Sequence, residues 1–178
     1  ISGSGGVTKT GTGTLTVDGT NTYTGATQIN EGTLAGSASF TGAVSFASGT
    51  TLAPGNSPGT LSTGDLDLVT GTNLEIEIGG AAANPGVDYD QVNVTGTVSL
   101  GGNLEVLPYS DFNGGESFVI INNDGADAVT GTFAGLPEGA TISMGASDLF
   151  TISYTGGDGN DVVLNSLNGT RVVTNTND

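Results

Sequence analysis

The residues best suited to chemistry are the side chains of Asp158, Asn160 and Asp161, which lie in the stretch 156–164. This stretch fits the calcium-binding β-roll pattern G-G-x-G-x-D-x-U-x, with Asp161 and Val163 in the required places. In that architecture Ca²⁺ sits between successive turns, so it needs oxygen ligands from stacked copies of the pattern. The sequence holds a single copy. It therefore favours a turn between two closing strands, and calcium binding by Asp158, Asn160 or Asp161 is the alternative.

Two pairs of carboxylates, Glu75 with Glu77 and Asp65 with Asp67, are each separated by one residue. On a strand such a pair would project from one face about 6.5–7 Å apart, because each residue rises about 3.3 Å. This distance overlaps the separation of the two carboxylates in inverting glycosidases. However, apolar residues alternate with the glutamates throughout 74–78. The pattern therefore favours a solvated strand face over a catalytic pair.

Other catalytic arrangements are poorly supported. The sequence has no His and no Cys, which excludes Ser-His and Cys-His pairs, zinc–thiolate sites and disulfides. Its basic residues are Lys9 and Arg171, near opposite ends of the chain, whereas a polysaccharide lyase would need a basic group beside a uronate carboxylate. We expect Lys9 on the surface. We predict that the chain is not an enzyme and has no catalytic or cofactor-binding residues.

The charge balance restricts the partners. Eighteen carboxylates against two basic residues give a formal net charge of −16. Nucleic acids and anionic membrane surfaces are disfavoured, since both need a basic protein surface. Solubility through self-repulsion, or attraction of divalent cations, accounts for the acidity. No apolar run approaches the length of a membrane span, so we expect no membrane insertion by this segment.

Local patterns predict an all-β chain. Helix-period spacing is nearly missing and Gly, with 32 residues, interrupts most windows. Apolar and polar residues alternate instead, which is typical of strands with one wet face. The alternating segments are 15–17, 44–46, 66–68, 74–78, 92–94, 98–100, 104–106 and 150–154.

The turns favour one of two all-β architectures over the other. The stretch 52–61 sets a Pro/Gly/Asn/Ser cluster between Leu52 and Leu61, which predicts a corner where one strand stops and the next begins. Thr-Gly pairs, such as Thr10-Gly11 and Thr41-Gly42, mark further corners between similar short segments. Self-similarity of this kind favours a β-solenoid, the coiled architecture of stacked turns, or rungs. A sandwich is the alternative, because its turns have similar spacing.

We predict one domain, residues 1–167. Residues 1–78 would form regular rungs. Residues 79–167 would form looser rungs with loop-rich insertions, among them the Gly/Ala/Pro-rich segment 79–90, and a closing hairpin. Residues 168–178 would be a polar tail or a linker to a further repeat. The chain begins at Ile1 rather than Met, so we expect a piece of a longer protein.

Short segments, most of them rich in Thr and Gly, lie at residues 6–17, 19, 21–25, 32–34, 52–61, 89–92 and 154–164. They resemble the autotransporter-associated β-strand repeat, also called the passenger-associated transport repeat. The resemblance implies a right-handed parallel β-helix on a bacterial cell surface, commonly the passenger of a secreted protein. The family is not defined by catalytic residues, so none is carried over.

We therefore expect a structural or adhesive segment of a large secreted or cell-surface bacterial protein, acting as a stiff acidic spacer. Its partners would be adjoining repeats, identical copies, or host or matrix glycans. The alternative is a filament subunit that pairs the opening residues 1–3 head to tail with the ending residues 172–175 of another copy. A third hypothesis is that the chain is a polysaccharide-acting β-helix enzyme.

Overall fold

The computed structural model describes residues 1–80, 82–108, 114–144 and 147–167. Over these ranges the chain consists of strands, turns and loops without a helix, which confirms the all-β prediction. The described residues accordingly contain no helix that could cross a membrane.

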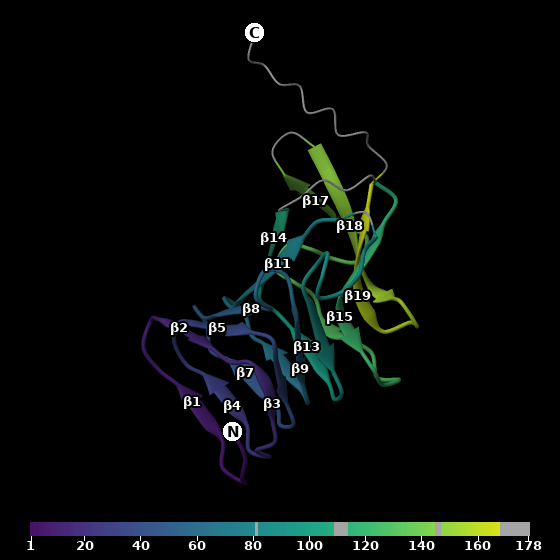
Figure 1. Ribbon diagram of the computed structural model, residues 1–178. Helices are drawn as coiled ribbons and strands as arrows, with labels where there is room; N and C mark the ends of the chain where they lie inside the picture. Colours follow the sequence, from purple (N-terminus) through teal and green to yellow (C-terminus); the bar gives the residue numbers. More distant parts are fainter. Residues whose placement is uncertain (81, 109–113, 145–146, 168–178) are drawn as a thin grey trace.

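The strands form three sheets, and from β1 to β16 successive strands enter the three sheets in turn, whereas β17, β18 and β19 all join the third sheet (Figure 1). The first sheet is parallel and consists of β1 (Val7–Lys9), β4 (Thr27–Ile29), β7 (Val44–Phe46), β10 (Leu66–Leu68), β13 (Val98–Leu100) and β16 (Thr130–Gly131). The second sheet is also parallel and consists of β2 (Thr14–Thr16), β5 (Thr33–Gly36), β8 (Thr51–Pro54), β11 (Asn73–Ile78) and β14 (Asn103–Pro108).

The third sheet is mixed. Its parallel part consists of β3 (Gly19–Asn21), β6 (Ala38–Phe40), β9 (Thr60–Thr63), β12 (Gln91–Val94) and β15 (Ser117–Asn123). Its antiparallel part consists of β19 (Asp161–Ser166), β18 (Ser147–Gly156) and β17 (Thr141–Met144), with β19 paired to β15.

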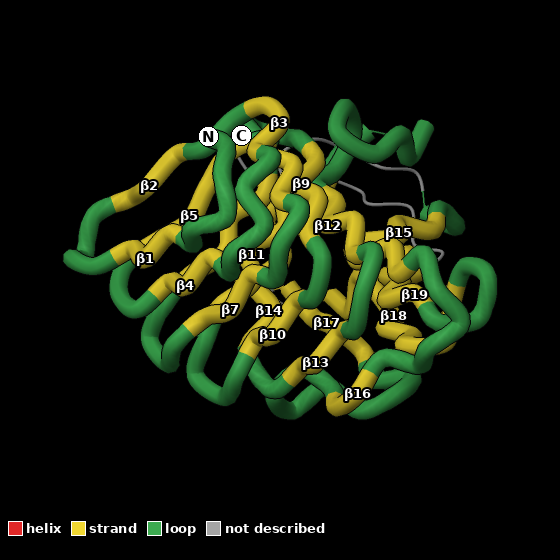
Figure 2. Tube along the Cα trace, turned by 90° about the horizontal axis from the view of Figure 1, so that it is seen from below, coloured by secondary structure: helices red, strands yellow, loops and turns green. Residues whose placement is uncertain are grey.

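One strand from each sheet makes a rung, and each rung lies on the one before it. Figure 2 shows this from the side of the coil, where the strands of the first sheet follow one another from β1 to β16. The backbone hydrogen bonds of the parallel pairs therefore run between rungs. This arrangement confirms the parallel β-helix and excludes the sandwich.

Apolar side chains at equivalent positions stack through the centre of the coil. In the second sheet Leu15, Leu34, Leu52, Leu74 and Leu104 occupy one register position, and the middle three are fully buried. Burying a leucine side chain stabilises the fold by about 1.5–3 kcal/mol. The inward residues of the alternating sequence segments thus form the core.

The stretch 52–61 is the predicted corner. It connects β8 of the second sheet to β9 of the third, and Leu52 and Leu61 are both buried at its two ends. Gly55 has a φ of +89°, and a Cβ on it would lie 2.3 Å from the backbone nitrogen of Gly59. Only glycine fits this position without a backbone shift.

The end of the coil is formed by the antiparallel strands. β18 and β19 make a hairpin that packs against β15, with Phe118 and Phe150 in edge-to-face contact at 6.0 Å between ring centroids. Tyr89, from the segment that connects β11 to β12, adds a second edge-to-face contact with Phe118 at 5.3 Å. Residues 168–178, predicted as a tail or linker, lie outside the described residues.

Candidate functional site

Of the calcium candidates, Asp158 and Asn160 lie in the turn between β18 and β19, and Asp161 is the first residue of β19. Asp161 is buried, and its Oδ1 accepts a hydrogen bond of 2.8 Å from the backbone nitrogen of Asn123 at the end of β15. The Nδ2 of Asn160 donates to the carbonyl oxygens of Gly125, at 2.7 Å, and Asp127, at 3.0 Å. Asp158 is exposed. Asn160 therefore holds the loop after β15 against the hairpin, and Asp161 is bonded to the end of β15 itself.

The electrostatics of this turn follow from its burial. Burial raises the pKa of Asp161, and the hydrogen bond from Asn123 opposes that shift. Among the described residues, no three His, Cys, Asp or Glu side chains are grouped so that they could hold a metal ion. The contacts support the turn that the sequence favoured, and calcium binding stays a prediction.

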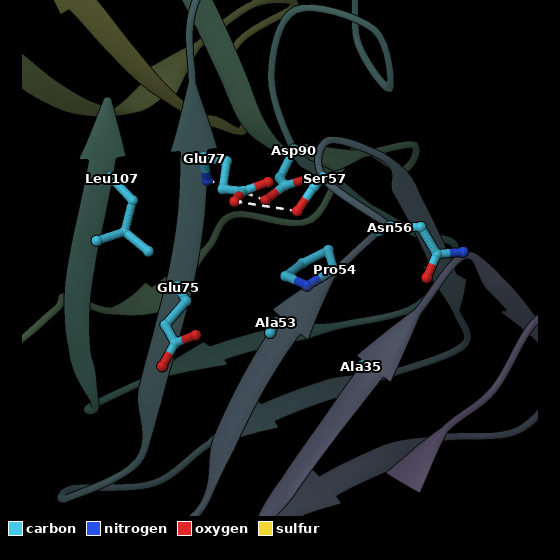
Figure 3. A pocket seen from close by; sticks show the side chains of 10 residues that line it. Ala35, Ala53, Pro54, Asn56, Ser57, Glu75, Glu77, Asp90 and Leu107 are labelled. Atoms are coloured by element: carbon cyan, nitrogen blue, oxygen red, sulfur yellow. Dashed lines mark hydrogen bonds between the residues drawn. The ribbon is translucent and has the colours of Figure 1, made fainter. Parts of the chain in front are cut away.

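A shallow groove of about 310 Å³ lies on the outer face of the second sheet (Figure 3). Ala35 of β5 and Ala53 of β8 are register neighbours and form its floor. Glu75 and Glu77 of β11 stand along it on one side, with Leu107 of β14 beyond them. The turn that follows β8 forms the opposite rim. We call this feature the alanine groove.

The two glutamates occupy the strand face that the alternation predicted. Leu74, Ile76 and Ile78 are fully buried, whereas Glu75 and Glu77 are half-buried on the outer face. Glu75 is also the register neighbour of Glu105 on β14. The pKa of Glu75 is raised, first by burial and then by the negative charges of Glu105 and Glu77.

The second predicted carboxylate pair does not share a strand face, which corrects the sequence interpretation. Asp67 lies within β10, but Asp65 precedes the strand and is exposed at the corner. Its Oδ1 accepts hydrogen bonds from the backbone nitrogen of Thr97, at 2.7 Å, and from the Thr97 hydroxyl, at 2.9 Å. These bonds lower the pKa of Asp65 because they stabilise its charged form. Asp65 therefore connects two successive corners.

Asp90, which was named above only within the segments 79–90 and 89–92, anchors the rim of the alanine groove. Its side chain is 2% exposed. Oδ1 accepts from the backbone nitrogen of Gly59 at 2.7 Å, and Oδ2 accepts from the backbone nitrogen of Glu77 at 2.9 Å. Burial raises the pKa of Asp90 to about 6 even though both bonds lower it. Its partners come from two other strand ends, so no local pattern could have indicated the contact.

Lys9 is buried, and the expectation of a surface position was wrong. It is the inward residue of β1 in register with Ile29. Its Nζ donates to the carbonyl oxygens of Gly11, at 2.5 Å, and Glu31, at 3.0 Å. The alternation of Val7, Thr8 and Lys9 is the signal that could have placed it inside. Arg171, the other basic residue, lies outside the described residues.

Comparison with known proteins bears on the first rungs. A family model described as passenger-associated-transport-repeat matches residues 7–35. This stretch is similar to a passenger-associated transport repeat. This match confirms the resemblance drawn from the sequence for the segments that lie within residues 7–35. The resembling segments 52–61, 89–92 and 154–164 lie outside the match. The repeat runs from β1 into β5, so it supplies one complete rung and two strands stacked on it, with Leu15 paired to Leu34. No curated protein and no solved structure matches the chain.

Proposed function

We propose that this chain is a non-enzymatic structural segment of a secreted or surface-exposed bacterial passenger protein, in which it acts as a stiff acidic spacer. The passenger-associated transport repeat supports the passenger setting and the location outside the cell. The observation that carries the spacer role is the unbroken register of the parallel rungs, from β1 through β13 in the first sheet.

The physical basis is mechanical. Each rung adds about 4.8 Å along the coil, and adjacent rungs are joined in all three sheets by backbone hydrogen bonds. The length of the coil therefore depends on the number of rungs, and the spacer needs no ligand to reach that length. The net charge of −16 disfavours close approach of like molecules, which suits a spacer on a crowded surface. If the segment is adhesive as well as a spacer, host or matrix glycans would be its binding partners.

The spacer role can be tested by removing one rung. Spin labels on Cys introduced at Thr8 and Ser99 are specific because the chain has no Cys, and both positions are exposed on the first sheet. Four strand spacings separate β1 from β13, or about 19 Å. Deletion of residues 44–65 should place β10 on β4 and shorten the label distance by about 4.8 Å.

The matched control is the full chain with the same labels. An unchanged distance, or loss of cooperative unfolding on deletion, would contradict a modular spacer. The alternative, that the chain is a polysaccharide-acting enzyme, is tested separately by depolymerisation assays on acidic and neutral glycans. Measured turnover of a glycan would contradict the structural proposal.

A filament subunit is the second candidate, supported by the open strands at the beginning of the coil. Within the described residues β1, β2 and β3 each pair on one side only. A second copy could pair with these edges. At the other end, however, the third sheet finishes in antiparallel strands, so a head-to-tail contact would not continue all three sheets. Residues 172–175, which the sequence suggested for this contact, lie outside the described residues. Fibres in electron micrographs would favour this candidate.

A further inference from the structure

We propose that the alanine groove binds a basic side chain, a lysine or arginine, presented by a partner protein or peptide. The shape of the groove suits such a side chain. Ala35 and Ala53 leave the sheet surface low between the β11 glutamates and the turn after β8, and Leu107 adds apolar surface at the far side (Figure 3). Lysine and arginine carry methylene stems that pack on apolar surface while the charged head lies at a polar edge.

Negatively charged glutamates lie beside the floor of the groove. Glu75 and Glu105 are register neighbours on parallel strands, and Glu77 lies two residues further along β11. Like charges directly opposite each other on neighbouring strands destabilise a sheet. A bound cation would remove this repulsion. The raised pKa of Glu75, caused partly by these neighbours, agrees with an uncompensated negative site.

The described part of the chain supplies no cation to this groove. Lys9 is buried, and its Nζ donates to backbone carbonyl oxygens of the first two rungs. The N-terminal ammonium group donates to Oδ1 of Asn21. With two basic residues against 18 carboxylates, charge complementarity points to a partner.

The groove is also fixed in shape before binding. Asp90 ties the backbone of Gly59 to that of Glu77, and so connects the turn to β11. The hydroxyl of Ser57 donates to Oε1 of Glu77 at 3.2 Å, which holds that side chain at the rim. Glu75 lies beside Ala53 over the floor (Figure 3). A preorganised groove loses less entropy when it binds. Glu75 is therefore the carboxylate that meets the basic head group.

The test is calorimetric titration with an oligolysine peptide. Ala53→Phe fills the floor without changing the charge, and Glu75→Gln removes the proposed partner carboxylate. Each should lower the association constant about tenfold or more, equivalent to about 1.4 kcal/mol. The matched controls lie on the outer face of the first sheet, where Ser45 and Asp67 are half-buried strand residues. Ser45→Phe and Asp67→Asn should change the constant less than about twofold.

Urea unfolding of each variant establishes that the fold is intact. The proposal is overturned if the unaltered chain does not bind oligolysine, because the site would then have no affinity for basic side chains. It is equally overturned if the first-sheet controls weaken binding as much as the groove variants, since attraction to the whole acidic surface would explain the result. Heat from Ca²⁺ but not from oligolysine, lost in Glu75→Gln, would assign the groove to a metal ion instead.

Discussion

Single residues show how the coil accommodates polar groups at inward positions. Lys9 occupies the register position that Ile29, Phe46 and Leu68 fill in the following rungs. Its ammonium group donates to backbone carbonyl oxygens that turn toward it at the corners after β1 and β4. A side chain of the first rung thereby supplies hydrogen-bond donors to carbonyl oxygens of both the first and the second rung.

Replacement of Lys9 by Met retains an apolar stem and removes the ammonium group. The carbonyl oxygens of Gly11 and Glu31 then lose this donor, so we expect Lys9→Met to lower the free energy of unfolding by about 1–3 kcal/mol. Urea unfolding measures the change. Gln28→Met, on the exposed outer face of β4, is the control and should stay within about 0.5 kcal/mol. Equal effects of the two substitutions would show that the Lys9 contacts contribute nothing to stability.

The same residues mark what the sequence could reveal. Glu75 and Glu77 were placed correctly because the apolar residues around them alternate strictly, which fixes the inward face of a strand. The burial of Asp90 depends on Gly59 and on the backbone of Glu77, which come close only after the rungs stack. Ala35 and Ala53 become a groove floor for the same reason, through the pairing of β5 with β8.

At the scale of the elements, the column of leucines in the second sheet is the clearest source of stability. Leu52 lies between Leu34 and Leu74 and is fully buried. Leu52→Ala should therefore lower the free energy of unfolding by about 2–5 kcal/mol, through lost burial and the cavity that remains. Leu107 is 37% exposed on the outer face of the same sheet, and Leu107→Ala should cost much less. Similar losses in urea titrations would mean that the column is not the core.

The hairpin of β18 and β19 closes the coil through Asn160. Asn160→Ala removes both hydrogen bonds to the loop after β15, so we expect faster proteolytic cleavage of residues 124–129. Asp158→Ala changes an exposed residue of the same turn and should leave the cleavage rate unaltered. Mass spectrometry of the fragments locates the cut. Cleavage at the same rate in both variants would contradict the role given to Asn160.

The order of the elements limited what could be predicted. Alternation located the strands and glycines located the corners, because both are local effects. The register between rungs is different, since the connections change in length. Val44 pairs with Leu66, and Leu66 pairs with Val98 across a much longer segment. No fixed period relates these partners, so only the folded coil shows which side chains share a column.

For the whole molecule, the carboxylates determine how stability depends on pH. Burial raises the pKa of Asp90 to about 6 from an ordinary value of 3.8, so the folded protein holds a proton there that the unfolded chain releases. The pKa values of Asp161 and Glu75 are raised as well, whereas that of Asp65 is lowered. Relief of self-repulsion at a net charge of −16 acts in the same direction as the raised groups.

A raised pKa in the folded state contributes stability that is complete below the unfolded value and is lost as the pH rises through the folded value. The free energy of unfolding should therefore increase as the pH falls from about 7 to about 4, with Asp90 contributing on the order of 2 kcal/mol after solvent screening. Urea midpoints across this range measure the slope. Asp90→Asn cannot ionise and should flatten the curve near pH 6. A protein that loses stability over this range would contradict the raised pKa of Asp90 and the balance of charges inferred for the coil.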